Sequence, residues 1–165
     1  MQAAQLYQIT LSYPASATQA LPPATDYSRD SALQSEGKSS VAASSPAIYG
    51  GDPGRYNPEE LMLMSLAQCH MLTYLSIAAK KQLKILRYED RAVGQLGVGK
   101  MGGIGLEGKI SLQQVTLHPR VTVPKGTNLD DARNIHIKAH ANCFMANSVN
   151  FPVTTEPEMV EADDS

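Results

Sequence analysis

Two cysteines, Cys69 and Cys143, are the residues of this 165-residue chain best suited to redox chemistry. A pair of thiols can form a redox couple, bind a metal ion together with histidine, or simply pack as small apolar side chains. His136, His140 and Cys143 follow one another at spacings of four and three, which on a helix could form the corner of a metal site. A zinc site would need a fourth ligand, for which Cys69 or His70 is available. The residue types alone leave these three interpretations open.

The composition limits the kinds of binding partner and the cellular compartment that we expect. Hydrophobic residues make up 42% and charged residues 18%, which is ordinary for a globular protein, and a net charge of −2 without a basic stripe argues against nucleic acid. Residues 1–5 lack the start of a signal peptide, and no apolar stretch approaches the roughly 20 residues that cross a bilayer. We therefore expect a cytoplasmic protein without a membrane partner or a structural disulfide.

The first cysteine lies in a predicted long helix. Asn57 is a good N-cap, Pro58 suits the first helical position, and Glu60 completes a capping box. We expect the helix to run from about residue 58 to residue 81. Its interior, residues 61–79, is apolar on nearly every face, which is typical of a central helix buried all round.

Strands are predicted before this helix. Alternation predicts a half-buried strand over residues 4–13, and a loop over 14–25 follows it. The apolar face of the strand would hold Tyr7, Ile9, Leu11 and Tyr13. Residues 26–43 are expected to form two short antiparallel strands that turn near Gly37, and the Gly- and Pro-rich residues 44–56 a loop that does more than connect.

Further strands are predicted after the helix. Residues 84–98 indicate a strand and residues 102–105 a turn. Residues 106–123 indicate a second strand region, in which the alternation changes phase between Leu112 and Val115. That change predicts a bulge, and Pro119 predicts an edge position or a bend.

A second helix is predicted near the second cysteine. Asn128 or Asp130 can cap it, and it should run to about Asn142. Residues 149–155 then alternate as a last strand, and residues 156–165 form a polar tail that should be frayed.

This order of elements predicts the α+β class. We expect a single domain over residues 1–165. It would consist of N-terminal strands and a loop (1–56), the central helix with Cys69 (57–82), and a C-terminal part with strands, the second helix with Cys143, a last strand and a tail (83–165).

Two segments resemble the cysteine motifs of the OsmC/Ohr family. The sequence NPEEL at 57–61, with AQCHML at 67–72, resembles the first motif, and AHANCFMANSV at 139–149 resembles the second. The residues around the two cysteines resemble the motifs of the OsmC-like branch more closely than those of the organic hydroperoxide resistance branch. The motifs have the right order and separation, and the resemblance extends from Tyr27 onward.

The resemblance implies a fold and a reaction. The fold is an intertwined homodimer with antiparallel sheets around two central helices. The reaction is a thiol-dependent reduction of organic hydroperoxides, with inorganic peroxide as a further substrate, in which Cys69 attacks and Cys143 resolves the sulfenic acid. No cofactor or metal is expected, and the reductant would be a thiol of the lipoyl or thioredoxin type. The alternative is a non-catalytic dimer of the same fold that binds a small ligand or a metal.

The resemblance also implies two residues that would activate Cys69. In the family an arginine from the N-terminal strands is held by a glutamate of the first motif, which here makes Arg29 and Glu59 the candidates, with Arg55 as the rival arginine. Glu59 and Cys69 lie ten residues apart (69 − 59), or roughly 15 Å along a straight helix. We therefore expect Glu59 and its arginine to reach Cys69 from the partner subunit. Adjacent helical residues point about 100° apart, so we expect His70 to be a hydrogen-bonded residue of the dimer core rather than a base for Cys69.

Overall fold

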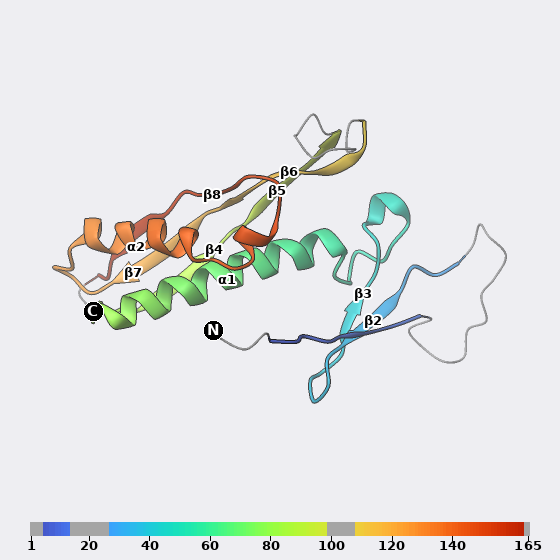
Figure 1. The fold of residues 1–165 in the computed structure, drawn as a ribbon, viewed down its shortest axis with the longest axis horizontal. Coiled ribbons are helices and arrows are strands. Elements are labelled where there is room, and N and C mark those ends of the chain that lie inside the picture. The colour runs from blue at the N-terminus through green and yellow to red at the C-terminus, as the bar shows by residue number, and fades with distance from the viewer. Residues whose placement is uncertain (1–4, 14–26, 99–107, 164–165) are drawn as a thin grey trace. The chain divides into compact units, whose positions relative to one another are not determined.

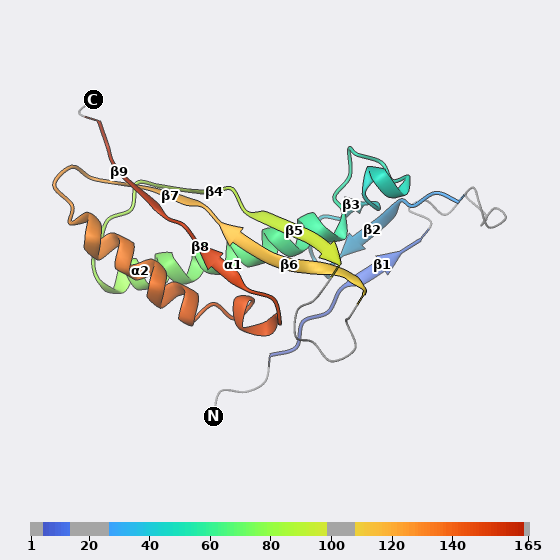
Figure 2. The same ribbon diagram turned by 90° about the horizontal axis from the view of Figure 1, so that it is seen from above.

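A computed structural model describes residues 5–13, 27–98 and 108–163 (Figures 1 and 2). The chain divides into two compact units, residues 1–61 and 62–165. The single domain expected over residues 1–165 stays a prediction. The loop predicted at 14–25 and the turn predicted at 102–105 lie outside the described residues.

The N-terminal unit contains a three-stranded antiparallel sheet, in the order β1 (Thr10–Ser12), β2 (Ser31–Gln34) and β3 (Val41–Ala43). The predicted hairpin is confirmed, because β2 and β3 pair around a turn in which Gly37 has φ 72°. A positive φ of this size favours glycine. The first strand is shorter than the predicted 4–13, and Tyr7, on its predicted buried face, is 84% exposed in the single chain.

The long helix is α1 (Pro58–Lys80), close to the predicted bounds. Its capping box is formed: the Glu60 N–H donates to Asn57 Oδ1 at 2.9 Å, and the Asn57 N–H donates to Glu60 Oε2 at 3.1 Å. The helix ends at Gln82, whose φ of 57° lies in the left-handed region, and the Leu83 N–H donates back to the Ala78 carbonyl at 3.0 Å. This is the usual way for a helix to terminate, with an uncommon residue in the left-handed position.

One stripe of α1 is fully buried within the single chain. It consists of Leu66, His70, Tyr74 and Ala78. The opposite face is open, and Leu72 is 56% exposed. The predicted all-round burial is therefore not reached within one chain. Among the described residues, α1 is also the one helix whose length and mean hydropathy would suffice to span a membrane, a property that core helices share.

The described residues of the C-terminal unit form two three-stranded sheets, and the chain passes from one sheet to the other and back. One has the order β4 (Arg87–Asp90), β7 (Pro119–Val123) and β9 (Glu158–Glu161), and the other β5 (Val93–Val98), β6 (Ile110–Leu117) and β8 (Val153–Thr155). The strand predicted at 84–98 is thus divided, since β4 pairs with β7 and β5 with β6. The predicted bulge is confirmed: Gln95 pairs with Gln114 but Leu96 pairs with Leu112, which leaves Gln113 as the extra residue.

The frayed tail predicted at 156–165 is wrong for residues 158–161. These residues form β9, which pairs in parallel with β7 and places Met159 in the core with 9% exposure. Polar flanking residues concealed this strand, because only Met159 and the half-buried Val160 supply apolar contacts. The pairing of β8 with β6 is also parallel, so both sheets are mixed.

The second helix, α2 (Leu129–Ala141), is capped by Asn128, whose side chain accepts the N–H groups of Asp130 and Asp131. The predicted bounds are confirmed. Tyr74 of α1 contacts Ala132, and His70 contacts His136, so the two helices run antiparallel side by side (Figures 1 and 2). Together with the sheets they enclose two groups of buried residues. One is Tyr74, Ala78, Val121, Val123, Ala132, Ile135, Ala139 and Met159, and the other is Leu66, Val115, Leu117 and Val153.

We expect Gln82→Gly to stabilise the protein. Removing the side chain from a left-handed position relieves a strain of about 1 kcal/mol, part of which is offset by the greater entropy of glycine in the unfolded chain. Urea unfolding should show a net gain of about 0.5 kcal/mol. The matched control is Lys81→Gly, one residue earlier and without a positive φ, which should lower stability. A loss of stability in Gln82→Gly would contradict the assignment of this helix end.

Candidate functional site

Cys69 lies midway along α1 and is partly exposed. Its sulfur accepts a hydrogen bond from the backbone N–H of Met145, with an N–S distance of 3.5 Å. An N–H group directed at a thiol sulfur favours the charged thiolate over the neutral form. The contact also connects α1 to the segment that follows α2.

Cys143 lies just beyond the C-terminal end of α2 and is 1% exposed. The pKa of Cys143 is raised to about 11: burial is the largest cause and the neighbouring Cys69 sulfur adds to it, while the N–H groups of Ala146 and Met145 act in the opposite direction. Both cysteines are free thiols. The structure thus brings together the two predicted cysteines, one partly exposed and one buried and protonated.

A groove of about 750 Å³ gives access to Cys69. It runs along α1 from Ser65 to Lys80 and is bordered on the other side by the end of α2 and the residues after it. Its apolar lining residues are Leu72, Ile77, Phe144 and Met145, and Lys80 and Lys138 are its charged ones. An apolar molecule of moderate size could approach the Cys69 sulfur along this groove.

A buried histidine pair lies beside the cysteines. His70 Nε2 and His136 Nδ1 are 3.0 Å apart, and the two rings are within 5° of parallel. His136 also stacks on Tyr74, with ring centroids 4.2 Å apart. Burial, with His140 nearby, lowers the pKa of His70 to about 4, and burial, with His70 nearby, lowers the pKa of His136 to about 3. Both rings are therefore neutral at pH 7, and the expectation of a hydrogen-bonded core histidine holds with a partner in the same chain.

The metal corner considered for His136, His140 and Cys143 is not formed. Within the described residues, no group of three or more His, Cys, Asp or Glu side chains is arranged to hold a metal ion. His136 instead directs Nδ1 at His70. The spacing of four and three reflects packing along α2.

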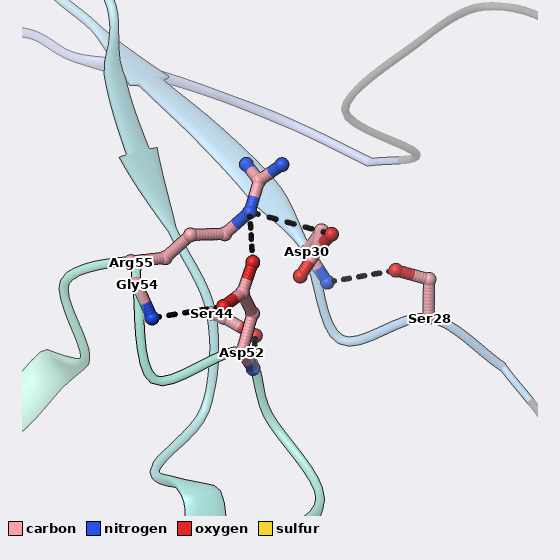
Figure 3. Close-up of polar contacts among 6 residues, drawn as sticks. All are labelled: Ser28, Asp30, Ser44, Asp52, Gly54 and Arg55. Carbon is pink, nitrogen blue, oxygen red and sulfur yellow. Dashed lines mark hydrogen bonds and ion pairs between the residues drawn. The ribbon is translucent and has the colours of Figure 1, made fainter.

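The two candidate arginines belong to the N-terminal unit and have different surroundings. The Arg55 Nε lies 3.4 Å from Asp30 Oδ2 and 3.2 Å from Asp52 Oδ2, so its charge is already compensated (Figure 3). Arg29 lies over the Tyr27 ring at 4.7 Å, and within the described residues it makes no ion pair. A Cβ at Gly50 would come within 3.2 Å of Arg29 Nη1, so glycine there permits the close approach.

The loop predicted at 44–56 is held by this network. Asp52 is bonded through both its side chain and its backbone: its Oδ1 accepts the Gly54 N–H at 2.8 Å, and its own N–H donates to Ser44 Oγ at 3.1 Å (Figure 3). On the strand side, the Asp30 N–H donates to Ser28 Oγ at 3.1 Å. Arg55 therefore joins the loop to the segment that carries Arg29.

Glu59 lies in the first turn of α1, and its Oε2 is buried. Among the described residues that oxygen has no hydrogen-bond partner. A buried carboxylate oxygen without a donor is costly, and a cation is the partner that compensates it best. Whether Glu59 and Arg29 serve Cys69 stays a prediction.

Two features of the site were not predicted from the sequence. The Met145 N–H belongs to the backbone, and its direction depends on how the chain turns after α2 into η2 (Ala146–Ser148), so no residue pattern indicates it. The bond between His70 and His136 joins residues 66 positions apart. The single available signal was the histidine spacing on α2, which suggested a metal.

The chain is similar to a known protein family and to solved structures of OsmC-like proteins. A family model described as OsmC-like protein matches residues 50–158. An OsmC-like protein of unknown function from Vibrio cholerae has 32% identity and a TM-score of 0.81, with 93% of this chain and 99% of that chain covered. No curated protein matches the chain.

More distant structures share the fold. An organic hydroperoxide resistance protein from Elizabethkingia anophelis has 19% identity and a TM-score of 0.65, with 97% of this chain and 100% of that chain covered. A structure from Legionella pneumophila, described as an organic hydroperoxide resistance protein and predicted redox protein, has 20% identity and a TM-score of 0.63, with 95% and 99% covered.

Acid should destabilise the protein through the histidine pair. The pKa of His70 is about 4 in the folded chain and near 6.5 in the unfolded chain, so between these values the unfolded chain binds more protons and stability falls as pH falls. By pH 4.5 the loss should be about 2 to 3 kcal/mol for this one residue. Urea unfolding at pH 7.5 and 4.5 measures it. His70→Gln keeps a polar side chain that does not titrate, so its stability should fall less between pH 7.5 and 4.5. An equal fall in stability in both proteins would refute the role of His70.

Proposed function

The chain belongs to the family of OsmC-like proteins, and we propose that it is a thiol-dependent peroxidase that reduces organic hydroperoxides through Cys69 and Cys143. The observation that carries this proposal is the contact between two free thiols, of which one, Cys69, borders a groove with apolar lining residues while the other, Cys143, is buried. The names of the Legionella and Elizabethkingia proteins support the substrate class.

The chemistry has two steps. The Cys69 thiolate attacks the outer oxygen of the hydroperoxide, the O–O bond breaks, and the alkoxide leaves and takes a proton to become an alcohol, with Cys69 oxidised to the sulfenic acid. The Cys143 sulfur then attacks the Cys69 sulfur, and a disulfide and water form. An external dithiol reduces the disulfide. Dithiols of the lipoyl or thioredoxin type fit this step, and the cytoplasm, where thiols stay reduced, is the compartment we propose.

The surroundings of the two sulfurs support these roles. Cys69 borders the groove, where a peroxide can reach it, and the Met145 N–H can stabilise negative charge on its sulfur. Cys143 is buried, which protects it from peroxide, and its raised pKa keeps it protonated until the sulfenic acid forms. A partly exposed thiol attacks and a protected one resolves.

We further propose that Arg29 and Glu59 of a second subunit activate Cys69 in an intertwined homodimer. Three observations support this: the unpaired guanidinium of Arg29 among the described residues, the buried Glu59 oxygen without a donor, and the open apolar face of α1. Ten residues of helix separate Glu59 from Cys69, so the glutamate cannot serve the cysteine of its own straight helix.

Cysteine substitutions test the reaction. We expect Cys69→Ser to abolish peroxide reduction, because no thiolate remains to attack. Cys143→Ser should complete one turnover and then accumulate sulfenic or sulfinic acid at Cys69. Peroxide consumption with a dithiol reductant, together with the mass of the oxidised protein, measures both. Full multiple-turnover activity in Cys69→Ser would sink the proposal.

Arginine substitutions test the activation. Arg29→Ala should slow peroxide attack about ten- to a hundredfold, because the guanidinium favours the thiolate. The matched control is Arg55→Ala, whose arginine is already paired with two carboxylates and should matter less. The pH dependence of Cys69 alkylation reads the effect directly. An unchanged profile in Arg29→Ala beside a displaced one in Arg55→Ala would transfer the role to Arg55.

Subunit mixing tests the shared site. If Glu59 acts across the interface, co-refolding a Glu59→Gln chain with a Cys69→Ser chain restores one complete site in each mixed dimer, and activity returns. If Glu59 acts within its own chain, no site has both groups and nothing returns. A folded, active monomer in sedimentation would refute the dimer altogether.

A further inference from the structure

The hydrogen bond between His70 and His136 joins α1, which contains Cys69, to α2, which ends just before Cys143. His70 directly follows Cys69 on α1, and His136 lies on α2. The atoms are 3.0 Å apart, and the rings are 0% and 3% exposed. No part of the two-step reaction uses either ring.

A buried polar pair of this kind lowers the stability of the fold but restricts how the two helices can be oriented. Each neutral ring carries one N–H, of which only one forms the bond between the rings, and His70 Nδ1 and His136 Nε2 have no hydrogen-bond partner among the described residues. Apolar side chains of similar size would fill the same space at a lower cost in folding free energy. The N–H···N bond, however, is directional and favours one arrangement of the helices, whereas the apolar contacts of buried Ala78 and Ala139 have no preferred direction.

The disulfide step is the one that needs this accuracy. Peroxide attack tolerates a larger displacement, because the residues beyond α2 contribute to it only groove lining and the Met145 N–H, a hydrogen bond at 3.5 Å rather than a covalent bond. A disulfide requires the two sulfurs to come within about 2.05 Å, with Cα atoms about 4.4 to 6.8 Å apart, so a displacement of α2 by a fraction of a turn prevents it. The position of Cys143 depends on where α2 ends.

We propose that His70 and His136 are positioning residues that hold α1 and α2 in the register at which Cys143 reaches Cys69. The inference rests on the proposed function in assigning this pair to the resolving step. Removing the bond should impair disulfide formation and slow peroxide attack much less.

The equilibrium between the Cys69–Cys143 disulfide and glutathione tests the inference without any peroxide. Titration in a glutathione redox buffer gives the effective concentration of one thiol at the other. His136→Leu should lower it about tenfold or more, since one buried hydrogen bond is lost. His136→Asn, whose amide can replace Nδ1, should return it to within about twofold of the wild type. The matched control is Tyr74→Phe, which removes another buried bond between the same helices, from the Tyr74 hydroxyl to the Ala132 carbonyl at 3.2 Å, and should leave the effective concentration unchanged.

Single-turnover kinetics then separate the two steps. In His136→Leu, sulfenic acid should form within about twofold of the wild-type rate and the disulfide about tenfold more slowly. Should the leucine variant not fold, His136→Asn and His70→Gln decide, because each keeps the hydrogen bond: wild-type effective concentrations support the inference and tenfold losses overturn it.

Three results would overturn the inference: a wild-type effective concentration in His136→Leu, no recovery in His136→Asn, or an equal loss in Tyr74→Phe. If the wild-type protein consumes no peroxide while the glutathione pattern holds, the proposed peroxidase function fails and the positioning of the thiol pair stands.

Discussion

The packing of α1 against α2 is the interaction on which the rest of the C-terminal unit depends. His70 and Tyr74 of α1 bond to His136 and Ala132 of α2, and Ala78 belongs to the same buried group as Ala132. This packing places the partly exposed Cys69 beside the chain that leaves α2, where the Met145 N–H and Cys143 lie. A rotation of α1 by one residue, about 100°, would turn Cys69 away from this segment and expose the histidine.

The same packing gives two chemically identical groups different properties. Burial opposes the ionisation of Cys143, while Cys69 borders the groove and accepts a hydrogen bond from the Met145 N–H. Differences of this kind need no special residue, because depth within the fold supplies them. The polar pair of His70 and His136 is the exception, since it brings two nitrogen atoms without partners among the described residues into an otherwise apolar contact.

Most of the helical structure could be predicted from the sequence, and much of the site could not. The capping residues Asn57 and Asn128 determine where the helices begin, and the change of phase between Leu112 and Val115 revealed the bulge at Gln113, because these signals are local. The contacts that build the site join distant residues. Cys69 with Met145 and His70 with His136 depend on helix packing, which the pattern of either segment alone does not determine.

The parallel pairing of β9 with β7 also bears on how the protein folds. Met159 of β9 belongs to the same buried group as Tyr74 of α1 and Val121 of β7, which precede it by 85 and 38 residues (159 − 74 and 159 − 121). Loop closure over such distances comes late and slowly in folding. During synthesis, α1, α2 and β7 therefore leave the ribosome before the residue that completes their core, and the apolar surface between them must wait for the last strand to arrive.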